Sequence, residues 1–188
     1  MKYVGIIGNN STESTNRTLM QYIARQFADQ AEIVVFEIRP MPPFKASEDR
    51  TVPAEVQSLV DAIADSDGVI ISTPEYDHTI PAALKSVLEW LSWSSEVMRD
   101  KPVMIVGASY GRLGTSRAQD HLRQILTSPW LRARILTSEF LLGGSQQAFD
   151  EEGNLTHETD VENLRTHFAE FKAFTEIMNE IELKEAAE

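Results

Sequence analysis

The chain has 188 residues, of which 17 are basic and 29 acidic, and a formal net charge of -12. This length suits one domain with a full-sized core, and the acidic balance excludes a broad nucleic-acid-binding surface. The sequence contains no cysteine, which excludes disulfides, thiol catalysis and cysteine metal sites.

No apolar run approaches the ~20 residues that a membrane span requires. The first predicted strand begins at Tyr3, without a charged leader and a cleavage site before it. We therefore expect a cytoplasmic protein with no membrane or nucleic-acid partner. We expect one domain over residues 1–183 and a frayed acidic tail at residues 184–188. The acidic turn at residues 150–154 lacks the alternating ligands of a calcium loop, so we predict no metal.

Short apolar runs alternate with helical patterns along the chain. The apolar runs predict five strands, at residues 3–7, 32–38, 68–72, 103–107 and 135–142. Apolar residues spaced by three and four positions predict sheet-covering helices near residues 19–27, 56–63 and 84–91, and a long last helix near residues 161–181. Because this alternation requires right-handed crossovers, we predict an α/β fold, a three-layer α/β/α sandwich around a five-stranded parallel sheet.

A hydroxyl-rich loop, residues 8–16, follows the first strand and leads into a helix predicted to start near Asn16 or Arg17. Side chains with hydroxyls or amides are concentrated just before that helix, at Ser11, Thr12, Ser14, Thr15 and Asn16. A helix N-terminus offers unpaired N–H groups and the positive end of a dipole, so this loop favours a phosphate site. Ordinary helix capping is the alternative, but one cap needs only one such residue.

The loop Pro74-Glu-Tyr-Asp-His-Thr-Ile-Pro81 follows the third strand. Its backbone is predicted to meet the edge of a heteroaromatic ring, with Tyr76 packing nearby. The alternative is a strand-to-helix turn punctuated by prolines. His78 follows Asp77, but a lone loop histidine is more typical of a surface residue, so no catalytic role is predicted.

The loop after the fourth strand contains Gly107-Ala-Ser-Tyr-Gly111, which matches the nucleophile elbow G-x-S-x-G. A serine hydrolase is therefore a rival hypothesis, in which Ser109 attacks and is assisted by Asp150 or Asp160 with His157 or His167. Against it, Gly111 and Gly114 prolong the loop, and no glycine-rich oxyanion motif precedes it. We favour close approach of a glycine backbone to a flat ligand.

Two tryptophans, Trp90 and Trp93, lie off the apolar stripe of the helix predicted near residues 84–91. They need a partner other than the sheet. Two partners are open, a second subunit or the loop at residues 40–44.

With these loops in view, the chain resembles the NADPH-dependent FMN reductase family, a flavodoxin-like group that includes azoreductases, quinone reductases and chromate reductases. The family's P-E-Y-N-x-x-x-P-x-x-L-K-N is the most specific motif, and it is met by Pro74, Glu75, Tyr76, Pro81, Leu84 and Lys85. The first loop matches the family at Gly8, Ser14 and Asn16. The glycine-rich loop and the residues after it match at Ser109, Gly111, Gly114, Arg117, Ala118, Leu122 and Arg123.

The resemblance implies a flavodoxin-like strand order, 2-1-3-4-5, with FMN at the C-terminal ends of strands one, three and four. It implies that NADPH or NADH passes hydride to flavin N5, and that a second small-molecule acceptor, such as free flavin, a quinone or an azo compound, is reduced next in ping-pong fashion, with no catalytic side chain. A homodimer or homotetramer is expected. The residues expected to bind the cofactor are Asn9, Ser11, Ser14, Thr15, Asn16, Pro74, Glu75, Tyr76, Asp77, Ser109, Tyr110, Gly111 and Arg112.

Two positions depart from the family pattern. Ser11 stands where the family has arginine, which leaves the phosphate to the helix end, the hydroxyls and Arg17. Asp77 replaces an asparagine, and a carboxylate near the ring would oppose the anionic reduced flavin. Asp77→Asn is then expected to raise the flavin potential, unless Asp77 faces solvent or caps a helix. The departures keep open a flavodoxin-like binding module without tight flavin binding, and the choice between NADPH and NADH is assigned to Arg112 or Arg117.

Overall fold

A computed structural model describes residues 1–48 and 51–185 of the protein, with side chains described as far as Ile181. The strands are β1 (Lys2–Ile7), β2 (Glu32–Glu37), β3 (Gly68–Ser72), β4 (Pro102–Ala108), β5 (Arg134–Ile135) and β6 (Phe140–Leu142). The helices are α1 (Thr15–Gln26), α2 (Ala54–Ala64), α3 (Ala82–Ser94), α4 (Ser116–Leu126) and α5 (Glu158–Glu185). The strands and helices alternate as far as β5, as the sequence predicts.

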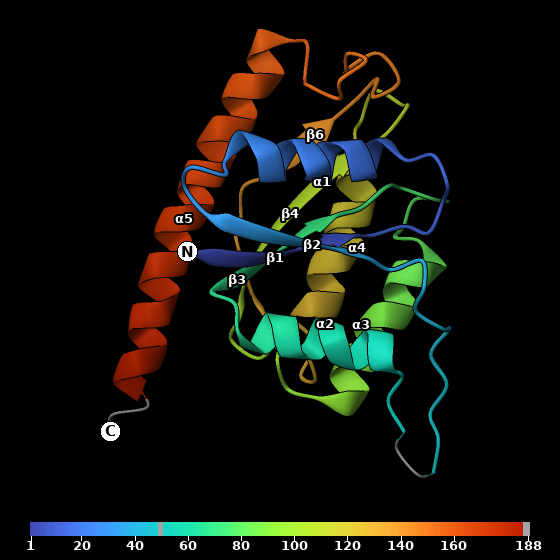
Figure 1. The fold of residues 1–188 in the computed structure, drawn as a ribbon, viewed down its shortest axis with the longest axis vertical. Helices are drawn as coiled ribbons and strands as arrows, with labels where there is room; N and C mark the ends of the chain where they lie inside the picture. Colours follow the sequence, from blue (N-terminus) through green and yellow to red (C-terminus); the bar gives the residue numbers. More distant parts are fainter. Residues whose placement is uncertain (49–50, 186–188) are drawn as a thin grey trace.

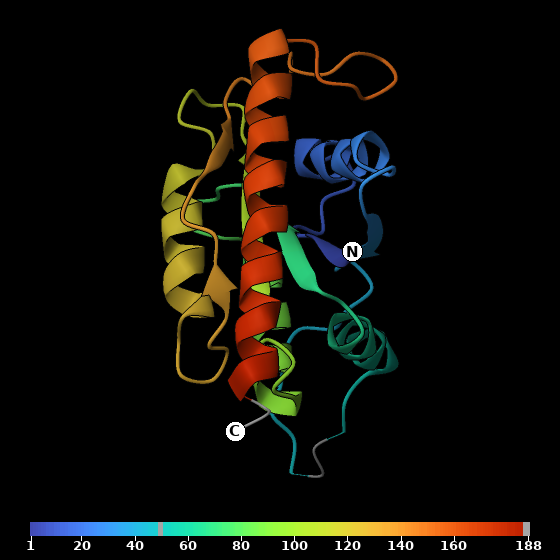
Figure 2. The same cartoon turned by 90° about the vertical axis from the view of Figure 1, so that its left-hand side faces the viewer.

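The strands form one parallel sheet in the order β2-β1-β3-β4-β5, and β6 also pairs with β4. This order confirms the flavodoxin-like fold. Helices α1 and α2 lie on opposite sides of the sheet (Figure 1). Successive residues of a strand face opposite layers: Val69 and Ile71 of β3 pack with α2, α3 and α4, whereas Ile70 packs with α1 and α5. Figure 2 shows α5 running beside α1, where the rings of Phe27 and Phe168 stack at 3.9 Å.

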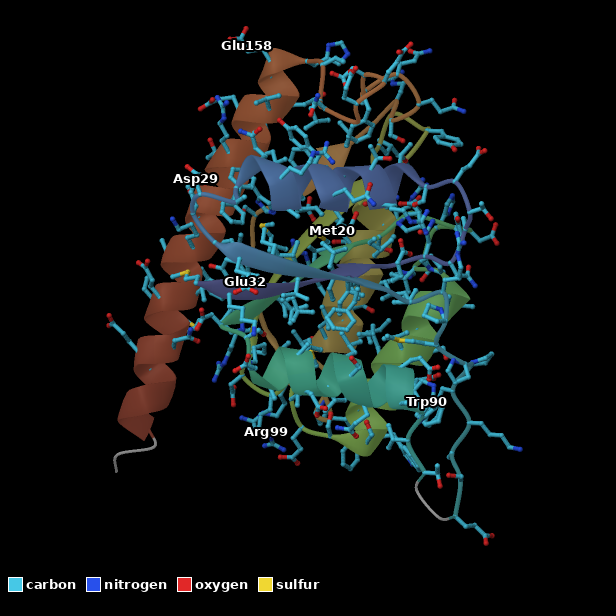
Figure 3. All side chains as sticks on the ribbon, in the orientation of Figure 1. Met20, Asp29, Glu32, Trp90, Arg99 and Glu158 are labelled. Carbon is cyan, nitrogen blue, oxygen red and sulfur yellow. The ribbon has the colours of Figure 1, made fainter. Side chains whose placement is uncertain are left out.

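The inner strands β3 and β4 are covered on both faces of the sheet. In β3 and β4 every residue is buried, which accounts for their nearly uncharged sequences. Met20 points from α1 toward the sheet (Figure 3), and it lies so close to Gly5 that a Cβ on this glycine would stand 2.7 Å from the methionine sulfur. The helices therefore hold the strand ends, and the loops that leave them, in a fixed frame.

The predicted fifth strand at residues 135–142 is two short strands. Ile135 pairs with Val103 and Phe140 pairs with Val106. The chain therefore advances five residues, from 135 to 140, while β4 advances three, from 103 to 106. The extra residues leave the ladder, and the guanidinium of Arg123 donates to the carbonyl oxygens of Leu136 and Ser138 at 2.7 and 3.1 Å. Side-chain donors thus replace the strand partner at the interruption.

Trp90 packs against the loop at residues 40–44, which is the second of the two partners considered for it. It is 4% exposed, its Nε1 donates to the carbonyl oxygen of Pro42 at 2.9 Å, and the ring of Phe44 meets it edge-on at 5.0 Å. Trp93 stands 6.0 Å from the same Phe44 ring. At the other end of the chain α5 continues through Glu185, and residues 186–188, which complete the predicted tail, lie outside the described residues. Among the described residues no helix is long and apolar enough to cross a membrane.

Candidate functional site

Three loops meet around a cavity of about 420 Å³ at the C-terminal edge of the sheet. They leave the adjacent strands β1, β3 and β4, and this is the edge where open α/β sheets bind ligands. The cavity lies within the usual size range of small-molecule sites, roughly 300–1,000 Å³. The lining residues are Asn9, Glu13, Ser14, Thr15, Asn16, Pro74, Glu75, Tyr76, Ala108, Ser109, Tyr110, Gly111, Arg112, Leu113, Gly114 and Arg117.

The sequence-predicted residues all line this cavity except Ser11 and Asp77. Ser11 stands one contact away, with its Oγ 3.1 Å from the hydroxyl of Tyr76. The cavity also includes Glu13, Ala108 and Leu113, which the sequence analysis did not single out. These three residues lie inside two loops that the sequence predicted to form the site, so their positions could have indicated them. They were not selected because a carboxylate and two apolar residues do not match the chemistry of a phosphate site.

Polar side chains of the first loop form hydrogen bonds with other groups of the protein. Ser14 is the N-cap of α1: its Oγ accepts from the N–H of Arg17 at 3.2 Å and donates to Asn9 Oδ1 at 2.9 Å. Thr15 Oγ1 lies 2.9 Å from the hydroxyl of Ser145. Ordinary capping is therefore present at Ser14, and hydrogen bonds within the protein occupy both hydroxyls.

Asn16 ties the three loops together. It is 2% exposed, its Nδ2 donates to the carbonyl oxygen of Ala108 at 2.7 Å, and its Oδ1 accepts from the N–H of Ala108 and the hydroxyl of Ser72. Every polar atom of this amide has a partner, so Asn16 fixes the start of α1 against the ends of β3 and β4.

Arg17 does not face the cavity. Its Nε and one terminal nitrogen contact the carboxylate of Glu37 at 2.5 and 2.9 Å, and the guanidinium also donates to the carbonyl oxygens of Ser11 and Thr12. The hydrogen bond to Glu37 is the main cause that raises the pKa of Arg17. Arg17 is not a lining residue and holds Glu37 and the loop carbonyls, so the structure does not support the expectation that it assists a bound phosphate.

A two-residue turn shapes the second loop. Asp77 and His78 have φ values of 49° and 65°, and the N–H groups of Tyr76 and Thr79 each donate to the other residue's carbonyl oxygen at 2.9 Å. Two successive left-handed residues between such a pair define a type I′ hairpin turn, in which aspartate and asparagine are favoured. Asp77 is exposed, which agrees with the solvent-facing alternative for its side chain.

Glu75 joins the second loop to the third. One of its oxygens contacts Arg117 at 2.5 Å, and the other accepts from the N–H groups of Arg117 and Ala118 in the first turn of α4. The side chain of Glu75 is only 8% exposed. A carboxylate at this position is stabilised by the positive end of the helix dipole, so Glu75 acts as a cap supplied from another loop.

The third loop does not form a hydrolase site. The hydroxyl of Ser109 donates to the carbonyl oxygens of Gly111 and Gly114. His167 is buried elsewhere, with Nδ1 3.0 Å from Ser138 Oγ and Nε2 3.3 Å from the carbonyl oxygen of Ile105, and this burial lowers its pKa. The side chain of Asp150 is bonded to Asn154, and His157 is exposed. The predicted triad is therefore not assembled.

The mouth of the cavity is apolar and open to solvent. Tyr76, Tyr110 and Leu113 are 46%, 62% and 59% exposed. Of the two arginines in the lining, Arg117 is paired with Glu75, whereas Arg112 has no ion-pair or hydrogen-bond partner for its side chain within the described part of the chain. A cleft with buried amides in its lining, flat rings at its mouth and one unpaired arginine suits a large, flat ligand that carries negative charge.

A parallel sheet of this order, with its cleft at the C-terminal strand ends, places the protein in the flavodoxin-like class. Residues 1–147 match the family described as NADPH-dependent FMN reductase, and the chain belongs to that family. It is 54% identical over 182 residues to the NADH:(hydroxy)cinnamate reductase subunit CrdA of Vibrio ruber, covering 96% of this chain and 90% of that protein.

Two further proteins extend the comparison. The chain is 41% identical over 182 residues to the NADH-dependent flavin reductase subunit 2 of Lactobacillus johnsonii, covering 94% of this chain and 98% of that protein. The structure of the flavoenzyme FerB from Paracoccus denitrificans has the same fold, with a TM-score of 0.78 and 21% identity over 95% of this chain and 97% of FerB.

The protein is thus an NAD(P)H-dependent flavin oxidoreductase that uses FMN. The third loop is uncrowded at Gly111, a lining residue, because a Cβ added there would meet nothing nearer than the Ser109 hydroxyl at 3.9 Å, and this openness agrees with close approach of a flat ring. When bound in this cavity, FMN would supply the redox chemistry between the nicotinamide and an acceptor. The protein's own groups bind, orient and shield the reactants.

Proposed function

We propose that the protein is the NADH-oxidising component of a two-component flavin reductase, in which electrons leave the site on a second flavin that is free or held by a separate polypeptide. The main support for this proposal is the exposure of the Tyr76 and Tyr110 rings at the mouth of the cavity, which leaves room for a second planar molecule. The names of the two relatives support this, because both are described as subunits that use NADH.

The residues proposed to hold FMN divide among the three loops. The backbone N–H groups at the start of α1 are proposed to meet the phosphate, and Ser14 and Thr15, whose hydroxyls are engaged within the protein, are proposed to hold this end of the cavity in shape. Pro74, Tyr76 and the Gly111 backbone are proposed to flank the ring. Supporting roles are proposed for Asn9, Asn16, Glu75, Ser109 and Tyr110, which hold or line the loops, and for Ser11 and Asp77, which act through Tyr76 and its turn.

Arg112 is proposed to meet the phosphates of the nicotinamide dinucleotide. It is the cation of the cavity lining that lacks a carboxylate partner among the described residues, and it belongs to the loop at the mouth. Charge-assisted contacts of arginine with phosphate are strong and often bidentate, which supports this role. A homodimer or homotetramer and a cytoplasmic location are also proposed, the second in keeping with a chain that has no cysteine.

Anaerobic stopped-flow mixing of the FMN-loaded protein with NADH or NADPH tests the donor. We expect NADH to remove the visible flavin absorbance at least about tenfold faster than NADPH at equal concentration, a difference of about 1.4 kcal/mol in activation free energy. Multiple-turnover assays with free FMN, riboflavin or a quinone then test the acceptor. Equal rates with both nucleotides, or reduction of quinone but not of excess flavin, would contradict the proposal.

A further inference from the structure

The first loop contributes a carboxylate to the cavity lining, and none of the lining residues that it contributes is a cation. Glu13 lines the cavity, its side chain is exposed, and within the described residues it has no hydrogen bond or ion pair. Two arginines that bond to this loop are not among the lining residues: Arg17 is paired with Glu37, and Arg39 donates to the carbonyl oxygen of Ser11 at 2.8 Å.

Two other polar side chains of the same end are engaged within the protein, whereas the side-chain nitrogen of Asn9, a lining residue, has no acceptor within the described part of the chain. The Ser14 hydroxyl donates to Asn9, and the amide of Asn16 is shared between Ala108 and Ser72. A phosphate bound there would depend on the backbone N–H groups of α1 and the Asn9 amide, and it would be repelled by the Glu13 carboxylate of the same lining. The lining arginines belong to the opposite loop, where Arg117 is already neutralised by Glu75.

We propose that Glu13 is a specificity-determining residue that cancels the contribution of the flavin 5′-phosphate, so that the cavity binds riboflavin about as tightly as FMN and exchanges its flavin readily. The inference rests on the proposed function, because a flavin that is exchanged or shared requires a site that does not trap it. A phosphate monoester carries about two negative charges at neutral pH, and its repulsion from a nearby carboxylate offsets what the helix dipole contributes.

Flavin fluorescence titrations of the purified protein test this directly. For the wild-type protein we expect dissociation constants for FMN and riboflavin that agree within about threefold, and an FMN affinity that stays constant or rises as salt screens the repulsion. Glu13→Gln should tighten FMN binding about tenfold and Glu13→Lys further, while riboflavin binding changes less than about twofold.

Glu180→Gln serves as the matched control, since this exposed glutamate lies on α5, is not part of the cavity lining and loses the same charge. It should leave both flavin affinities unchanged. The inference is overturned if wild-type protein binds FMN much more tightly than riboflavin, if added salt weakens FMN binding severalfold, or if Glu13→Gln moves both flavins equally. Failure of both flavins to bind at all would instead refute the proposed function.

Discussion

Two nearby glycines, Gly107 near the end of β4 and Gly111 in the third loop, have different surroundings. A Cβ on Gly107 would stand 1.7 Å from Thr115 Oγ1 and 2.7 Å from the carbonyl oxygen of Thr73, so this position packs against the start of α4 with no room to spare. A Cβ on Gly111 would point into open space. Neither glycine has positive φ, so backbone conformation does not distinguish them.

Gly107→Ala should therefore lower the free energy of unfolding by about 2–3 kcal/mol, because the core must open to admit the methyl group. Gly111→Ala should change it by less than about 0.5 kcal/mol. Urea unfolding of the two variants beside the wild-type protein checks the contrast. Equal losses at both positions would show that the two positions are packed alike and that Gly111 has no free space beside it.

At the scale of the element, the turn at Asp77 and His78 sets the position of both Tyr76 and Glu75. Left-handed backbone is tolerated by aspartate and asparagine but strained for a β-branched residue. The exposed Asp77 carboxylate is surrounded by water and lies outside the cavity lining, so its field at the cavity is weak.

Asp77→Val should cost about 1–2 kcal/mol of stability and weaken FMN binding, because the distorted turn displaces Tyr76. Asp77→Asn, the matched control, should preserve both, and it should leave the flavin reduction potential nearly unchanged in place of the rise expected from the sequence. Urea unfolding, flavin titration and spectroelectrochemistry measure the three quantities. If Asp77→Asn raised the potential by 30 mV or more, roughly 1.4 kcal/mol for a two-electron couple, the carboxylate would have to act on the ring.

Local patterns predicted the elements and the three loops because apolar periodicity and strand ends are local properties. They located Pro74, Tyr76 and Ser109 for that reason. The direction of Arg17 and the bridging role of Asn16 were not predictable, since they depend on Glu37 and Ala108, which are 20 and 92 residues away. The split of the fifth strand likewise depends on the donors of Arg123, which replace ladder hydrogen bonds.

At the scale of the whole molecule, His167 couples stability to pH. This residue of α5 is 3% exposed and its Nε2 lies 3.3 Å from the carbonyl oxygen of Ile105 in β4. Desolvation is the main cause that lowers its pKa. The unfolded chain, with a histidine pKa of about 6.5, therefore binds a proton more readily than the folded protein. Stability from this group is complete above that value and is lost as pH falls through it, by at most about 1.4 kcal/mol per pH unit.

Urea unfolding between pH about 7.5 and about 5.5 should accordingly show a falling free energy of unfolding. His167→Gln should flatten that dependence, whatever its effect on stability at neutral pH. His157→Gln, a change at an exposed histidine, should retain the wild-type slope. A wild-type slope that survives in His167→Gln would assign the pH dependence to other groups.

The most direct test of the account is an anaerobic NADH titration of the FMN-loaded protein, run in parallel on Gly111→Trp, which adds a large side chain at a lining position where a Cβ meets no backbone atom within 4 Å. We predict that the wild-type protein binds FMN saturably and that NADH removes its visible absorbance stoichiometrically. Gly111→Trp should stay folded by circular dichroism and bind no flavin. Wild-type protein that binds no FMN, or a folded Gly111→Trp protein that binds and reduces it equally well, would contradict a flavin site in this cavity.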